Sequence, residues 1–226
     1  IYKSLNCGPG SKDKKNKIKI NLKIVKEKIS KKCEDIFLLH QIHSSKFVFI
    51  KKKFRINKKK IEADAVITNK KKLPIAVLTA DCVPILLYDN KNNMIAAIHA
   101  GWKGAFKGIV DKVIKFMIKK GCKLENITAL KSTSISSKNY EIKENFKKKF
   151  IKKDKKNLIF FKNKKNKLYF DLPKYIYASL KTIKIKHIDF LKIDTFDIKN
   201  KFFSARRALK LKHNDYGRNI SIIMLN

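Results

Sequence analysis

The stretch Met94-Ile95-Ala96-Ala97-Ile98-His99-Ala100-Gly101-Trp102-Lys103-Gly104 passes from an uncharged apolar run into a turn rich in glycine. A short apolar run of this kind predicts a strand that is buried on both faces. Three of the seven glycines, Gly101, Gly104 and Gly108, fall within this turn and the residues that follow it. Glycine permits positive φ and lets the backbone approach a ligand, although the glycines alone also fit a tightly packed turn. We therefore expect a buried strand that His99 ends, a turn, and then a helix.

Helical periodicity follows the turn directly. From Ala105 to Lys119 apolar residues recur at steps of three and four, and Gly121 stands where a helix would stop. A second helix is predicted to start with Asp171 as its N-cap and Pro173 in its first turn. Glu141–Phe150 is a third predicted helix.

Further apolar runs of strand length indicate a body rich in β-sheet, so the predicted fold class is α/β or α+β. No internal repeat or Gly/Ser-rich linker divides the sequence, and one hydrophobic core can serve a chain of this length. We expect a single domain over residues 1–226 that lacks its native start, because the chain opens at Ile1. The predicted strands are Ile36–Leu39, Phe47–Ile50, Ala63–Ile67, Ile75–Leu78, Val83–Tyr88, Met94–Ile98, Leu158–Phe161, Ile188–Ile193 and Ile220–Met224.

The formal charge of +38 would suit a nucleic-acid partner, but its composition argues for an ordinary solvated surface. Only four of the 56 basic residues are arginine, and the lysines are spread over nearly every segment. A protein that reads bases favours the planar fork of arginine. Lysine runs at 51–53, 58–60 and 147–156 resemble loops or helix faces. We therefore expect no nucleic-acid partner.

The four cysteines are scattered without a CxxC pair, and no apolar stretch has the length of a membrane span. This pattern favours a reduced, cytoplasmic setting and no membrane partner.

Three side chains that bind metals well, His43, Cys82 and His99, each adjoin an expected strand. Three ligands of this kind suit zinc and leave a fourth tetrahedral position open, as in catalytic sites. Asp81 beside Cys82 is a candidate proton carrier or partner of a ligand histidine, and so is His40 near His43. The wide spacing of the three is by itself a weak signal, because a lone cysteine or histidine is more often structural.

Arginine is rare in this chain, so each retained arginine suggests a need for planar, bidentate geometry. Arg206 and Arg207 follow the aromatic pair Phe202-Phe203 and suit either a buried ion pair or recognition of phosphate or a nucleoside. Arg218, after Gly217, is typical of a turn that anchors the last strand.

Several segments, in their order along the chain, resemble the laccase-domain family, also described as multicopper polyphenol oxidoreductases or YfiH-like proteins. The resemblance covers almost the whole chain. It rests on Ser4-Leu5-Asn6-Cys7-Gly8, His40-Gln41-Ile42-His43, Ala63-Asp64-Ala65-Val66-Ile67-Thr68, Leu78 to Tyr88 with Thr79-Ala80-Asp81-Cys82-Val83-Pro84, Ala97 to Gly104, Tyr140-Glu141-Ile142, Asp171-Leu172-Pro173, Phe202 to Arg207 and Tyr216-Gly217-Arg218.

The resemblance implies a zinc-dependent purine nucleoside phosphorylase that is in some members also an adenosine deaminase, with purine nucleoside and phosphate as its partners. It implies a central mixed β-sheet flanked by helices, a fold shared with deamidases of the cytotoxic necrotizing factor type, and, more weakly, a monomer. It also implies that His43, Cys82 and His99 hold the zinc. Candidate substrate-binding residues are Asn6, His40, Lys103, Arg206 and Arg207.

The sequence departs from the family pattern at several places. Lys103 stands where the family usually has arginine, and Ser132 to Asn139 replaces a Gly-Pro-x-Ile-Gly segment followed by cysteines. Asp194-Thr195 stands where Cys-Thr is common, so extra thiol ligands are absent from these positions.

Three other functions compete with this interpretation. A copper-dependent polyphenol oxidase would want a weak axial methionine, and Met94, Met117 and Met224 have no ligand-like neighbours in the sequence. A basic nucleic-acid-binding domain would not need Cys82. A cysteine hydrolase would use Cys82 and His99 without a metal.

Overall fold

A six-stranded mixed sheet forms the centre of the molecule, in the order β11-β7-β5-β6-β3-β2. The computed structural model describes residues 1–2, 4–51 and 61–226. The outer pairs β11 with β7 and β2 with β3 are parallel, whereas the inner neighbours are antiparallel. The predicted mixed sheet is therefore confirmed. Its strands are β2 (Phe47–Ile50), β3 (Ala65–Thr68), β5 (Val83–Asp89), β6 (Met94–Ala100), β7 (Ile127–Lys131) and β11 (His187–Phe190).

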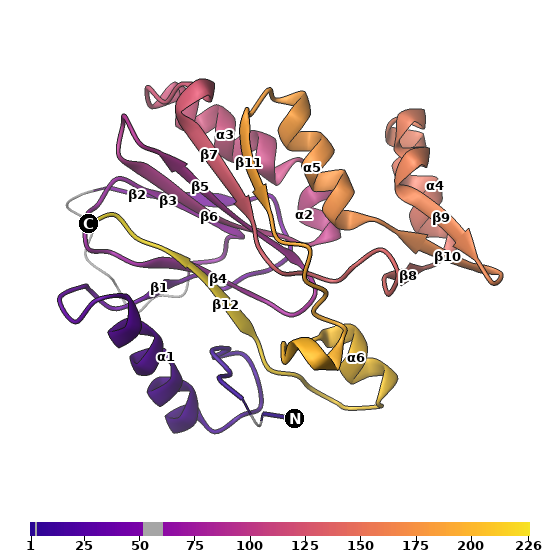
Figure 1. Cartoon of the computed structure of the whole chain (residues 1–226), viewed down its shortest axis with the longest axis horizontal. Helices are drawn as coiled ribbons and strands as arrows, with labels where there is room; N and C mark the ends of the chain where they lie inside the picture. Colours follow the sequence, from indigo (N-terminus) through magenta and orange to yellow (C-terminus); the bar gives the residue numbers. More distant parts are fainter. Residues whose placement is uncertain (3, 52–60) are drawn as a thin grey trace.

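A second sheet, β1 (Phe37–Leu38), β4 (Ile75–Thr79) and β12 (Asn219–Ile223), packs on one face of the central sheet (Figure 1). Strand β6 shows how the two layers share the core. Ile95 and Ala97 belong to the apolar cluster on the β4 side, while Ala96 and Ile98 belong to the cluster on the helix side. Because side chains alternate along a strand, an unbroken apolar run is needed where both faces are covered.

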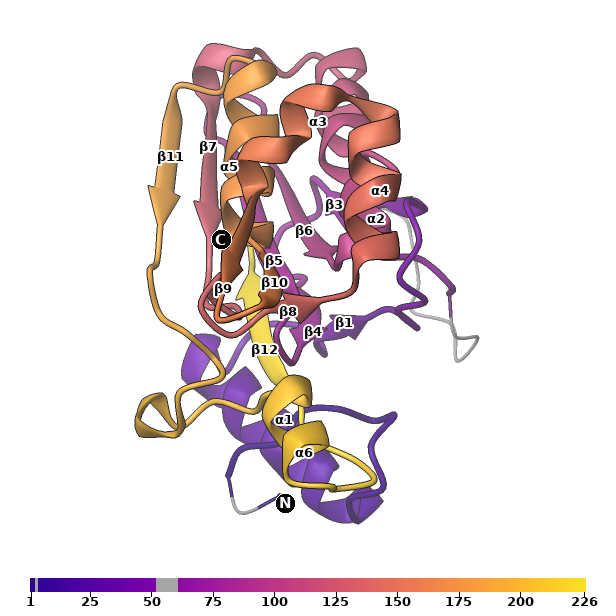
Figure 2. The same cartoon turned by 90° about the vertical axis from the view of Figure 1, so that its right-hand side faces the viewer.

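Helices cover the other face of the central sheet, chiefly α3 (Ile109–Lys119) and α5 (Leu172–Thr182) (Figures 1 and 2). The short α2 (Trp102–Phe106) follows β6, and α4 (Glu144–Lys153) lies beside a small antiparallel sheet, β8-β10-β9. On the opposite side, α1 (Lys15–Ile29) and α6 (Ala205–Lys210) lie near β12. The small sheet consists of β8 (Glu141–Ile142), β9 (Phe161–Lys164) and β10 (Lys167–Phe170), and the 3₁₀ helices are η1 (Leu124–Asn126), η2 (Lys155–Phe160) and η3 (Ile198–Asn200).

The helix signals are confirmed in part. Asp171 caps α5 by accepting a hydrogen bond from Lys174 N, and Gly121 ends α3 with φ 94°. The helix predicted from Ala105 to Lys119 is interrupted, because Gly108 adopts φ 72° and separates α2 from α3. No helix in the described part of the chain is both long and apolar enough to cross a bilayer.

One assignment is wrong, and another is confirmed only from Glu144 onward. Most of the predicted strand Leu158–Phe161 is the 3₁₀ helix η2, with Leu158 and Ile159 more than half exposed. The predicted helix Glu141–Phe150 begins as strand β8 and becomes helical only at Glu144. Of the lysine runs, 147–156 lies on α4 and η2, while 52–60 falls outside the described residues.

Asp89 holds the turn between β5 and β6, and its replacement by alanine should give a pH-dependent loss of stability. Its fully buried carboxylate accepts from Lys91 N, Asn92 N and Asn92 Nδ2. Burial raises the pKa of Asp89, but these hydrogen bonds outweigh burial and hold it below its ordinary 3.8. Because the folded-state pKa is depressed, this stability is present above the unfolded pKa of about 3.9 and is lost as pH falls through the lower, folded-state pKa.

We expect Asp89→Ala to lower the free energy of unfolding by about 1–3 kcal/mol at pH 7, as measured by urea denaturation. The difference from the parent should shrink below pH 4. A difference that stays constant down to acid unfolding would contradict this role for the carboxylate.

Candidate metal centre

His43, Cys82 and His99 converge at one end of β6, although they come from three different parts of the chain. Their ligand atoms all lie within 4.8 Å of one another. Cys82 Sγ is 3.7 Å from His43 Nε2, close to the roughly 3.6 Å that tetrahedral zinc with ordinary bond lengths requires between ligands. His99 is buried, Cys82 half-buried and His43 exposed, so the group has a closed side and an open side. The donor set therefore fits a metal with an accessible position.

Strand pairing explains the convergence. His99 lies in β6 opposite Pro84 of β5, so the turn that carries Cys82 into β5 adjoins it. The loop after β1 brings His43 over the same edge, where the two histidine rings meet edge to face with centroids 4.7 Å apart.

Asp64 holds His43 and His99 in place through hydrogen bonds, and the sequence analysis did not identify it as a site residue. Its carboxylate is fully buried and lies 2.8 Å from His99 Nδ1. It also accepts from His43 N at 2.9 Å, Ser44 N at 2.6 Å and Ser44 Oγ at 2.7 Å. A proton on His99 Nδ1 leaves Nε2 free as a ligand, which is the carboxylate–histidine arrangement typical of metal sites. The available signal was a single charge inside the apolar run Ala63–Ile67.

The charges in the group favour a thiolate. Burial raises the pKa of Cys82, but the positive charge of His99 and hydrogen bonds from His43 and His99 outweigh burial and lower it to about 6. Burial lowers the pKa of His99, yet Cys82 and Asp64 outweigh burial and raise it to about 9. Hydrogen bonds from His99 and Ser44 overcome the effect of burial on Asp64 and lower its pKa to about 2. A metal bound here would take the place of the proton shared by Cys82 and His99.

Gly101 lets the backbone pass directly under the ligands. A Cβ at this position would lie 2.9 Å from His43 Cδ2 and 3.0 Å from Cys82 Sγ. Because Gly101 has φ −70°, the requirement here is space and not backbone conformation.

Replacing Gly101 by alanine should therefore weaken metal binding without unfolding the chain. The added methyl must displace two ligand side chains, so we expect a loss of metal affinity of about 10- to 100-fold, comparable to the loss of an outer partner of a ligand. Competition with a chromophoric chelator measures it. Gly10→Ala is the matched control, since a Cβ at Gly10 would meet nothing within 4 Å. Unchanged metal affinity in Gly101→Ala would show that the ligands lie elsewhere.

The open side of the group faces a cavity of about 380 Å³. His40 lines it together with the three candidate ligands, and so do Tyr216 and Arg218 from the segment before β12. The Arg218 guanidinium lies 3.9 Å from the Tyr216 ring centroid and 3.5 Å from Asp215. The last arginine of the chain thus lies at the site, a place for which its turn-like sequence context gave no signal.

Asp81 precedes Cys82 but is held away from the cavity. Its carboxylate accepts from Arg206 N at 2.6 Å and from Thr195 Oγ1 at 2.8 Å, and it is buried. Burial raises its pKa despite these hydrogen bonds. Asp81 has φ 91°, so the carboxylate fixes an unusual turn that presents Cys82. In this geometry Asp81 holds the turn that carries Cys82, through hydrogen bonds with Thr195 and Arg206.

The two arginines predicted to bind substrate lie outside the cavity. Arg207 donates to the carbonyl oxygens of Thr195, Phe196 and Phe202 and so holds its own loop. Arg206 donates to Glu141 O and lies 5.2 Å from the Tyr140 ring centroid, in a separate depression.

Asn6 and Lys103 are likewise not on the cavity wall. Asn6 is fully buried, and its amide is engaged by Ser11, Asp13, the Gly8 backbone and the Arg218 backbone. It therefore helps to position the segments of Gly8 and Arg218, which line the cavity. Lys103 is exposed on α2 beside Trp102.

Comparison with known proteins identifies the family of the chain. The whole chain, residues 1–226, matches the family described as multi-copper polyphenol oxidoreductase laccase. It is 35% identical to a Rickettsia conorii protein named purine nucleoside phosphorylase, over 84% of this chain and 77% of that protein. A Haemophilus influenzae protein of the same name is 31% identical, over 98% and 87%.

Solved structures show the same fold. The Bacillus licheniformis protein YfiH superposes with a TM-score of 0.89 at 25% identity, covering 99% of this chain and 86% of that one. A Neisseria meningitidis protein of the DUF152 family gives 0.84 at 26% identity, covering 100% and 88%. With a match over its full length and an arrangement of sheets and helices shared with YfiH, the chain belongs to the multi-copper polyphenol oxidoreductase laccase family.

Proposed function

We propose that this chain is a zinc-dependent purine nucleoside phosphorylase, converting a nucleoside such as inosine, adenosine or guanosine and phosphate into the free base and ribose 1-phosphate. The observation that carries the proposal is the His43, Cys82 and His99 group, braced by Asp64 and open to a cavity. The names of relatives with 30–35% identity support the reaction class.

His43, Cys82 and His99 would hold the ion, which when bound supplies positive charge to orient phosphate or polarise the base. Phosphate attacks the anomeric carbon as the glycosidic bond breaks, and the bonding electrons leave with the purine. Arg218 is placed to bind an anionic or polar substrate group from the cavity wall. His40, exposed on the same wall, is our candidate to deliver a proton to the departing base.

Metal analysis combined with a product assay tests the proposal. Purified protein should contain about one zinc per chain and release hypoxanthine from inosine only when phosphate is present. With adenosine, release of adenine marks phosphorolysis, whereas release of inosine marks adenosine deamination. Full activity in metal-free protein would exclude a zinc enzyme.

A copper oxidase fits the described residues less well. Met94 and Met117 lie in the core on the helix side of the central sheet, and no methionine in the described ranges lines the cavity. A blue-copper centre commonly uses a weak axial methionine, which this site does not offer. Oxidation of a phenol by copper-loaded protein at rates above those of phosphorolysis would reverse this choice.

Arg218→Met should separate substrate binding from the metal centre. Loss of a planar cation from the wall is expected to raise KM for phosphate or nucleoside about tenfold or more, because a hydrogen bond to a charged group contributes about 1.5–3 kcal/mol. Zinc content should be unchanged. Steady-state kinetics over both substrates measures the effect. Lys103→Met is the control, because Lys103 is exposed on α2 and absent from the cavity wall. An unchanged KM in Arg218→Met would remove Arg218 from the substrate site.

We further propose that residues 1–226 act as a single-domain monomer in the cytoplasm, without a nucleic-acid or membrane partner. All four cysteines are free, which suits a reducing compartment.

A further inference from the structure

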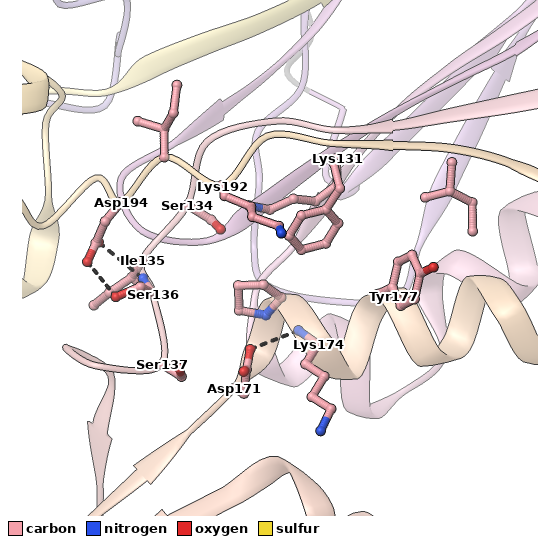
Figure 3. A pocket seen from close by; sticks show the side chains of 14 residues that line it. Lys131, Ser134, Ile135, Ser136, Ser137, Asp171, Lys174, Tyr177, Lys192 and Asp194 are labelled. Carbon is pink, nitrogen blue, oxygen red and sulfur yellow. Dashed lines mark hydrogen bonds between the residues drawn. The ribbon is translucent and has the colours of Figure 1, made fainter.

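A second and larger cavity, of about 590 Å³, lies on the helix side of the molecule between the ends of β7 and β11 and the start of α5 (Figure 3). None of the three metal-binding side chains lines it. Its walls are mainly apolar, with Pro173 and Tyr177 from α5 facing Ile188 and Phe190 of β11. The proposed phosphorolysis uses no residue of this cavity.

Lys131 places a nearly buried positive charge in this apolar wall. Its side chain is 2% exposed, and its ammonium donates to Leu191 O at 2.8 Å. The ammonium also lies 4.5 Å from the Phe190 ring centroid. An ammonium carries three N–H donors, so this environment leaves Lys131 able to bind another acceptor. Burial lowers the pKa of Lys131 to about 8, which leaves it mostly charged at neutral pH.

Ser134 adds an unused hydroxyl to the same cavity. It is 1% exposed, and among the described residues its Oγ has no hydrogen-bond partner. Leaving a buried hydroxyl unpaired is unfavourable, and such a group in a native protein calls for a ligand or water. Figure 3 draws Ser134, Lys131 and Lys192 around the same part of the cavity.

The charges around the cavity favour a ligand with one negative charge. Three lysines and two aspartates line it, an excess of a single positive charge. Both carboxylates already accept hydrogen bonds from protein donors, Asp194 from Ser136 and Asn139 and Asp171 from Lys174 N. The lining residues that carry charge are Lys131, Lys174, Lys192, Asp171 and Asp194.

We propose that this cavity is a binding site for a small organic monoanion, with its carboxylate on Lys131 Nζ and Ser134 Oγ and its apolar or aromatic body against Ile188, Phe190 and Tyr177. The hydroxyl and ammonium supply the donors that a carboxylate accepts, and the remaining wall excludes water from an apolar group. The site stands independently of the metal centre and of the proposed reaction.

Phenylacetate, its neutral isostere phenylacetamide and ligand-observed NMR test the proposal. Phenylacetate should bind at least about tenfold more tightly than phenylacetamide, because a charge-assisted hydrogen bond is worth that factor. Lys131→Met should abolish this preference. Ser134→Ala should weaken phenylacetate binding several-fold while leaving Tm unchanged or raised, since it removes an unpaired buried hydroxyl.

Two controls locate the anion. Lys162→Met removes an exposed lysine on β9 and should not alter phenylacetate binding. This variant tests whether phenylacetate is attracted only weakly and non-specifically to the basic surface. Cys82→Ala should retain phenylacetate binding, because Cys82 does not line this cavity. This variant tests whether the carboxylate of phenylacetate is bound at the candidate metal centre instead. Equal binding of acid and amide, full binding in Lys131→Met and Ser134→Ala, or loss of binding in Cys82→Ala would each overturn the proposal.

Discussion

Replacing Cys82 by alanine is expected to remove both the bound metal and phosphorolysis. Cys82 supplies the thiolate of the group, and its neighbours lower the thiol pKa to about 6, so it is the anionic ligand at neutral pH. Removing a ligand itself should cost more than the 10- to 100-fold typical for an outer partner of a ligand. Zinc per chain after dialysis and kcat/KM for inosine with phosphate measure the two effects.

Cys122→Ala is the matched control for this experiment. Cys122 is a free cysteine like Cys82, but it is buried in the core against Met94 and does not belong to the His43, Cys82 and His99 group. It should lose on the order of 1 kcal/mol of stability and keep its zinc and turnover. Retention of zinc in Cys82→Ala would contradict the ligand assignment. Activity that depends on Cys82 but survives a chelator would instead indicate the cysteine hydrolase considered above.

The metal group could be predicted from the sequence because its members mark the ends of strands. Apolar runs located β5 and β6, and Cys82 and His99 adjoin them at positions that antiparallel pairing brings to the same edge. The position of His43 was harder to predict from the pattern alone, because a long-range contact anchors its loop. The Gln41 side-chain amide donates a hydrogen bond to Leu78 O and accepts one from Leu78 N. That long-range contact has no local signature.

Other features could not be predicted from the local sequence pattern. From Ile18 to Ile24 apolar residues alternate as in a strand, yet the segment forms α1, in which only Ile18 is buried. The position of each arginine relative to the cavity could not be predicted from local pattern either. Rarity suggested that each guanidinium has a geometric task. Of the three arginines that the structure describes, Arg207 donates to backbone carbonyls, and only Arg218 lines the cavity.

Asp64→Asn is expected to have the second large effect, and on the metal more than on the fold. The neutral amide stabilises a proton on His99 Nδ1 less well than the carboxylate does. In a fraction of the molecules the proton therefore lies on Nε2, which then has no free lone pair to bind the metal. We expect metal affinity to fall about 10- to 100-fold. Titration of metal-stripped protein with zinc should show activity recovering at correspondingly higher zinc concentrations.

The dependence on added zinc separates a positioning role from a merely structural one. If Asp64 only supported the fold, Asp64→Asn would unfold at lower urea concentration but follow the same zinc titration curve as the parent. Asp89→Asn is the matched control, because Asp89 is equally buried and joins β5 to β6 at the end away from His99. It should alter stability and leave the zinc curve in place. A shift of both variants by the same factor would show that buried charge in general, and not the hydrogen bond to His99, sets metal affinity.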